Sequence, residues 1–361
     1  MEKFFDYNRS ADESFNSLVD CTIDLARQCY AGQKAVDYKE KNRQLLNAMG
    51  KKMVEGTRYE AEFEAQGLPL FKNPNVRNNT SIRDNFNAVI AQVVTAYVPE
   101  VVNNTFSDFI AEVKQVGFGE TARFIIESND LFKVNRKAEG VRKGVDQPMY
   151  DDEFTVNASP IEISTHIDWY PFAAGEFNMG NFALKIGRSF AAYIFLQAIK
   201  GMTNATAQFG AAYTTNGVTP QLFGTLRERV SAANGGMNVV AIGTAIALSN
   251  CSLTGNYQVQ IGEEMNKVGY LDQYLGVPLI GLKNVLVPGT TNSSATLALD
   301  DQKIFIVPVA GDRPVKIVFE GNEVSVAYNP EETADTRYGI TVTMRVGVSA
   351  ICGAKYGTIA L

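Results

Sequence analysis

The first third of the chain has the apolar spacing of amphipathic helices. Apolar residues recur every three or four positions among charged ones over residues 11–55, which predicts helices that end near Gly50. Residues 66–81 are rich in Gly, Pro and Asn and indicate extended, turn-rich chain. A further helix is expected from Ile82 to Tyr97, ending before Pro99, because the residue before a proline is pushed out of the helical region. We expect these helices to be loosely attached to the rest.

From about residue 120 the apolar period changes to two. Strands are predicted at Thr121–Glu127 and Leu131–Val134, and a charged stretch follows them. A third strand alternates strictly, so one face carries Ile161, Ile163, Thr165, Ile167 and Trp169, and the other carries Glu162, Ser164, His166, Asp168 and Tyr170. These strands predict a long β-hairpin arm that reaches out from the body and returns, with a charged tip.

The remaining two-fifths of the pattern predicts a long helix and a second α/β unit. The helix is expected over Asn178–Lys200, after Pro171 ends the strand, and residues 203–220 are interpreted as a linker. Thr244 is an acceptable N-cap for a further helix. Short apolar segments predict strands at Val239–Ile242, Gly276–Ile280, Val285–Pro288, Lys303–Val309, Val315–Phe319, Val324–Tyr328 and Tyr338–Cys352. The whole pattern is that of an α+β protein.

Composition and charge narrow the function. The chain has 361 residues, 45% of them hydrophobic, and a formal net charge of -6. This acidity disfavours tight, sequence-independent DNA binding, because neutralising phosphates supplies most of that affinity. The start of the chain is not a signal peptide, and the apolar stretch Phe190–Ile199 is too short for a bilayer. We therefore expect a soluble protein made in the cytoplasm, without a membrane partner and with reduced cysteines.

Catalytic and metal-binding patterns are missing from the sequence. The one histidine, His166, lies in the alternating strand and is expected to face solvent or an interface. G-x-S-x-G, H-E-x-x-H, C-x-x-C and Walker patterns do not occur. Residues 117–122 match a degenerate G-x-G-x-x-A loop, but the predicted context is not the required strand before and helix after. We interpret them as a turn entering the hairpin, and expect no enzyme, cofactor or metal site.

The arm is the candidate contact surface. An extended arm exposes backbone and apolar side chains, which invites pairing with another chain. The residues that we assign to contacts between subunits are Lys133, Arg136, Lys137, Arg142, Lys143, His166 and Trp169. For the basic run, solvation and contact with nucleic-acid phosphates are the alternatives.

Four stretches resemble the HK97-type major capsid proteins of tailed phages. They are Ile161–Trp169 with the helix that follows it, Tyr274–Ile280, Gly311–Pro314 and Asp335–Val342. The resemblance implies an HK97-like capsid fold with four parts. These are an N-terminal arm with helices in residues 1–118, an extended hairpin (the E-loop) in 119–176, a peripheral domain with a long spine helix in 177–220 and 316–361, and an axial α/β domain in 221–315.

The resemblance also implies a function. Copies of the chain would form pentamers and hexamers that close into an icosahedral shell around packaged double-stranded DNA, without sequence-specific contacts. Implied partners are portal, scaffolding and decoration or minor capsid proteins, and the implied location is the virion capsid, assembled in the host cytoplasm. The alternatives are an encapsulin-type nanocompartment, against which the long N-terminal third argues, and a cytoplasmic enzyme of unrecognised chemistry.

Overall fold

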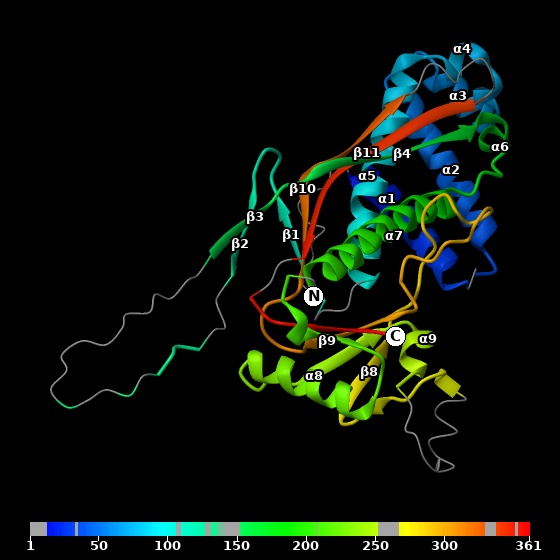
Figure 1. Ribbon diagram of the computed structural model, residues 1–361. Helices are drawn as coiled ribbons and strands as arrows, with labels where there is room; N and C mark the ends of the chain where they lie inside the picture. Colours follow the sequence, from blue (N-terminus) through cyan, green and yellow to red (C-terminus); the bar gives the residue numbers. More distant parts are fainter. Residues whose placement is uncertain are drawn as a thin grey trace.

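The protein folds into helices and sheets along an elongated body with a protruding strand pair (Figure 1). The computed structural model describes residues 13–32, 35–105, 110–126, 131–134, 136, 139, 152–206, 208–251, 267–328, 337–350 and 353–361. Helices and strands both contribute to its cores, which confirms the α+β fold class.

The N-terminal helices are an integral part of the main core. They are α1 (Glu13–Ala31), α2 (Tyr38–Val54), α3 (Glu60–Gln66), the 3-10 helix η2 (Leu68–Lys72), α4 (Pro74–Arg77) and α5 (Thr80–Thr105). Leu25, Leu46 and Ile90 are fully buried in one cluster with the long helix α7 (Met179–Thr206). The expectation that this third is loosely attached is therefore wrong, because its apolar faces pack against α7.

Two helix ends predicted from Gly and Pro are also wrong. Helix α2 continues past Gly50, where a Cβ would lie 2.7 Å from Cζ of Phe63. The glycine thus permits close packing and does not stop the helix. Helix α5 continues past Pro99 to Thr105. Residues 66–81 form short helical turns instead of extended chain.

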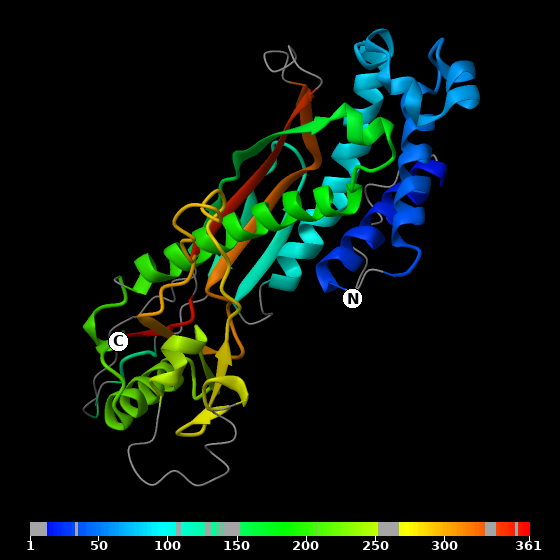
Figure 2. The same ribbon diagram turned by 90° about the vertical axis from the view of Figure 1, so that its right-hand side faces the viewer.

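A four-stranded sheet lies beside α5 and α7, in the order β1-β10-β11-β4. Its strands are β1 (Ala111–Val116), β10 (Val315–Tyr328), β11 (Arg337–Ala350) and β4 (Ser159–Asp168). Strand β1 runs parallel to β10, and the other neighbours are antiparallel. Figure 2 shows α7 crossing this sheet, with the N-terminal helices at one end of the body. The two C-terminal strands are therefore inserted between the strands that precede and follow the arm.

The arm is a narrower ribbon than the sequence indicated. Strand β2 (Ala122–Ile126) pairs with β3 (Asp152–Val156) and stands off the body in Figure 1. The predicted strand Leu131–Val134 is not formed. The alternation of Ile161–Trp169 is confirmed by its burial, but this strand pairs with β11 and does not belong to the arm ribbon. Alternation identifies the buried face of a strand and not its partner.

A six-stranded sheet forms the other end of the body, in the order β5-β12-β9-β6-β8-β7. Its strands are β5 (Thr214–Asn216), β12 (Gly357–Ala360), β9 (Lys303–Pro308), β6 (Val239–Gly243), β8 (Val277–Gly281) and β7 (Gln273–Tyr274). The helices nearby are α8 (Pro220–Ala233), α9 (Ala245–Ser249) and the 3-10 helix η3 (Ala211–Tyr213). Oγ1 of Thr244 accepts a hydrogen bond from the backbone N–H of Ala247 at 3.1 Å, which confirms the predicted N-cap.

Three expectations for this end need correction. Residues 285–288 hold only an isolated bridge between Leu286 and Leu297. The expected linker 203–220 contains the end of α7, η3 and β5. Strand β12 pairs with β9 and buries Ile359 completely, so it lies in the six-stranded sheet and not with the peripheral part to which residues 316–361 were assigned.

Helix α7 is the main structural helix. It is 28 residues long and apolar enough, by length and composition, to cross a membrane. Most of its apolar window is buried inside the protein, however, against α1, α5 and β11. Its composition is that of a core helix.

Candidate assembly surface

The predicted contact residues have different environments. Lys133, Arg136 and His166 are exposed, the first two beyond the β2–β3 ribbon and His166 on the edge strand β4. Lys137, Arg142 and Lys143 lie outside the described residues. The structure thus leaves three of the predicted side chains accessible to another molecule.

Trp169 is not accessible in this way. It begins the short helix α6 (Trp169–Ala173), and only 4% of its surface is exposed. Its ring centroid lies 5.7 Å from that of Phe71, 5.6 Å from that of Phe172 and 6.1 Å from that of Phe86. The assignment of Trp169 to a contact between subunits is wrong, because the ring is enclosed by the core of its own chain.

The arm carries exposed apolar side chains that the sequence analysis missed. Leu131, Phe132 and Val134 are 94%, 59% and 94% exposed, and Ile125 at the end of β2 is also largely exposed. The signal was present in the sequence, but the run was interpreted as a half-buried strand. Apolar side chains gathered on one protruding segment mark an interaction surface.

The base of the arm is fixed by a buried charge cluster. Nζ of Lys316, whose residue is 1% exposed, donates to Oε2 of Glu112 at 2.5 Å and also to Oδ1 of Asp312. The ammonium group lies 5.3 Å from the ring centroid of Phe124 on β2. Burial opposes ionisation of Glu112, but the hydrogen bond and charge of Lys316 outweigh it and lower the pKa of the carboxyl. A buried lysine without these carboxylates would be strongly destabilising.

The G-x-G-x-x-A stretch is the turn between β1 and β2, as expected. The Glu120 carboxylate accepts a hydrogen bond from the backbone N–H of Gly117 at 2.9 Å, and Gly119 has a φ of 80°. Glu320 accepts from the N–H of Gly119 at 3.0 Å and from Nε of Arg345 at 2.8 Å. The Arg345 and Gly119 hydrogen bonds lower the pKa of Glu320. A strand precedes this turn, which the sequence analysis did not predict, and another strand follows it.

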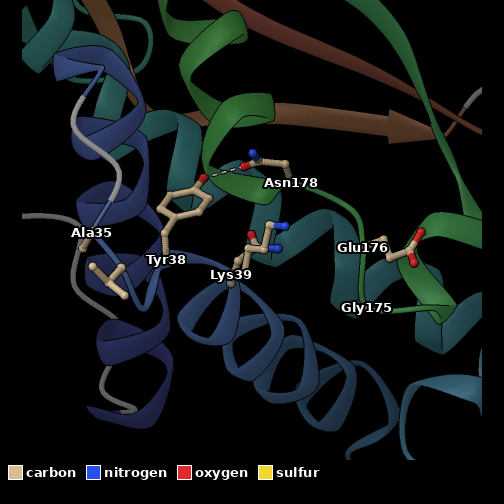
Figure 3. A pocket seen from close by; sticks show the side chains of 8 residues that line it. Ala35, Tyr38, Lys39, Gly175, Glu176 and Asn178 are labelled. Carbon is tan, nitrogen blue, oxygen red and sulfur yellow. Dashed lines mark hydrogen bonds between the residues drawn. The ribbon is translucent and has the colours of Figure 1, made fainter.

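A cavity of about 600 Å³ lies between the α1–α2 connection and the α6–α7 connection. Figure 3 shows Lys39 on the α2 side and Glu176 on the connection to α7. The lining residues are Ala35, Val36, Tyr38, Lys39, Asn42, Gly175, Glu176 and Asn178. Val36 is fully exposed at the edge of this space. The cavity joins segments far apart in sequence, so no local pattern announced it.

The polar groups of the cavity wall are bonded to one another. The Tyr38 hydroxyl donates to Oδ1 of Asn178 at 2.6 Å (Figure 3), and burial together with a hydrogen bond to Cys29 raises the pKa of Tyr38. Nδ2 of Asn42 donates to the Phe177 carbonyl at 2.8 Å. Oδ1 of Asn42 accepts from the backbone N–H of Met179 at 3.2 Å. These bonds attach α2 to the first turn of α7.

Within the described residues, no group of three or more His, Cys, Asp and Glu side chains could hold a metal ion. The arrangement offers contact surfaces: an apolar segment on the arm, exposed charges near it, and a cavity on the body.

Comparisons with known proteins add a family and a set of structures. The model of the family described as "SPbeta prophage-derived putative capsid protein YonB" matches residues 14–360. No curated protein sequence matches the chain. Similar solved structures include the capsid of a native GTA particle, at 12% identity and a TM-score of 0.47 over 70% of this chain and 88% of that one. The mature capsid of bacteriophage PhiM1 is 11% identical, with a TM-score of 0.46 over 72% of this chain and 87% of that one. A virus-like particle from Pyrococcus furiosus is 12% identical, with a TM-score of 0.42 over 74% and 98%.

Proposed function

The chain belongs to the family of the SPbeta prophage-derived putative capsid protein YonB, and we infer from this that it is a major capsid protein of the tailed-phage, HK97-like type. The family match over residues 14–360 is the observation that carries the conclusion. The protein has a structural role, assembles with copies of itself and is located in the virion capsid. An encapsulin-type shell is not favoured, since the matching family is one of prophage capsid proteins.

The finer picture is a proposal. Pentamers and hexamers of the chain close into an icosahedral shell that encloses double-stranded DNA, after assembly in the host cytoplasm. The net charge of -6 supports a container that does not hold its cargo tightly. Portal, scaffolding and decoration or minor capsid proteins complete the particle, and the subunit carries out no catalysis.

We also propose a division of labour within the chain. The ribbon β2–β3 and the residues beyond it serve as the E-loop, α7 and the four-stranded sheet as the peripheral domain, and the six-stranded sheet as the axial domain. Contacts between subunits involve the basic residues of the arm, which are Lys133, Arg136, Lys137, Arg142 and Lys143, together with His166. The exposure of Lys133, Arg136 and His166 supports this assignment.

Negative-stain electron microscopy of the purified chain tests the function. We expect uniform shells, rings or tubes, and a monodisperse monomer that persists at high concentration would contradict the proposal. Deleting residues 136–146 should leave a folded, soluble body that no longer assembles. A matched variant that replaces 136–146 with a Gly-Ser segment of the same length separates the loss of contacts from a change in loop length. Shells at normal yield from both variants would show that the contacts lie elsewhere.

A further inference from the structure

We propose that the cavity beside the N-terminus of α7 receives the apolar arm segment Leu131–Val134 of a second copy of this chain. The inference rests on the proposed function, because it requires copies that assemble. It adds the place on the receiving subunit and the side chains that enter it.

The arm segment has the character of an inserted ligand. Three of its four residues are large and apolar, and all three have most of their surface exposed to water. In an extended segment Phe132 and Val134 lie on the same face, since side chains alternate. These two side chains can therefore enter one cavity together, while Lys133 between them points to the other face.

The cavity suits an apolar occupant. Its volume of about 600 Å³ is large enough for more than one side chain, and the exposed Val36 lies at its edge. Its polar wall groups are already bonded within the subunit: Tyr38 to Asn178, and Asn42 to the chain around Met179. An apolar insertion would thus remove water without leaving these groups unsatisfied, which is the condition for burial without a penalty.

Charges on the two surfaces are complementary. The cavity is flanked by Glu176 on the α7 side and Lys39 on the α2 side. The arm presents the cations Lys133 and Arg136 next to its apolar residues, with the anion Glu139 further along. A basic residue of the arm facing Glu176 fixes the position of the segment in the cavity, as charged pairs at the rim of an interface do.

The placement of the two surfaces requires two subunits. In Figure 1 the β2–β3 ribbon extends from one side of the body, whereas α2 and α6, which flank the cavity, lie on the opposite side. Insertion is therefore head to tail, from one copy into the next. Such heterologous contacts generate rings when the rotation closes, as a capsomer requires.

A disulfide test addresses this contact directly. One population carries Phe132→Cys and another carries Val36→Cys, and the two are co-assembled and oxidised. We expect a disulfide-linked dimer that contains one chain of each kind. Ile246→Cys, at an exposed position on α9, is the matched control for Val36→Cys and should lose this dimer. The unmodified chain, with free Cys21, Cys29 and Cys251, gives the background.

Charge reversal gives a second, independent measurement. Lys133→Glu and Glu176→Lys should each reduce the yield of shells, and the double variant should restore it. Shells that form without the Phe132–Val36 cross-link, together with no rescue in the double variant, would overturn the cavity assignment and leave the capsid function intact. A native chain that never assembles would instead refute the proposed function itself.

Discussion

Replacing Trp169 with alanine should destabilise a single subunit by about 3–5 kcal/mol, the usual cost of removing a large buried aromatic side chain. The ring is 4% exposed and contacts three other rings, those of Phe71, Phe86 and Phe172. Aromatic pairs of this geometry add about 0.5–1.5 kcal/mol each beyond the buried area. Phe71 and Phe172 are themselves fully buried, so they have little room to close the space left behind. We therefore expect the upper half of the range.

The assay must separate folding from assembly. The substitution is made in the chain that lacks residues 136–146, and the free energy of unfolding is measured in urea by far-ultraviolet circular dichroism. Fluorescence is unsuitable because Trp169 is the one tryptophan of the chain. The control is Tyr170→Ala, at the neighbouring position, where the side chain is 58% exposed and the change should stay within about 0.5 kcal/mol.

Two results would refute this reasoning. A loss below about 1.5 kcal/mol, under the usual range for such substitutions, would mean that the aromatic cluster is not closely packed. A variant with normal stability that fails to assemble would mean that the ring contacts a neighbouring subunit after all.

Two further predictions concern packing and acid. Gly180→Ala should cost about 1–3 kcal/mol by overpacking, because its Cβ would lie 2.9 Å from the carbonyl carbon of Leu25, whereas Gly224→Ala in α8 meets nothing within 4 Å and should stabilise by about 0.4–1 kcal/mol; thermal melts of both variants decide this. The folded pKa of Glu112 is lowered from 4.5, so its contribution to stability is present above that value and is lost as the pH falls through the folded pKa. Urea midpoints of the native chain should therefore decline with acid below about pH 4.5, and Glu112→Gln should flatten that decline; an unchanged slope would mean that the pairing with Lys316 does not govern it.

Local patterns predicted much of the fold because they report burial. The alternation from Ile161 to Trp169 gave the buried face correctly, and Thr244 gave a helix start. Pairing was different: β4 joins β11, more than 150 residues away, and a period of two carries no information about a partner. Gly50 was interpreted as a local stop, although its role depends on Phe63, which packs against it.

The candidate surface was predicted in part. The basic arm residues were visible as a charge run, but the apolar character of Leu131–Val134 was interpreted as strand pairing that does not exist. The cavity could not be predicted, because Tyr38 and Asn178 are 140 positions apart. Trp169 was assigned to the surface since its neighbours were polar, although its own side of the strand is buried.

The insertion of β10 and β11 between β1 and β4 has a consequence for the order of synthesis. Glu112 and Lys316 pair across 204 positions, so the sheet that holds both ends of the arm is incomplete while the chain is still on the ribosome. Contacts of such long range form slowly and late. A chain truncated before residue 315 has no partner for β1 or β4 and leaves its arm unanchored. Completion of translation therefore acts as a checkpoint that keeps unfinished subunits out of the growing shell.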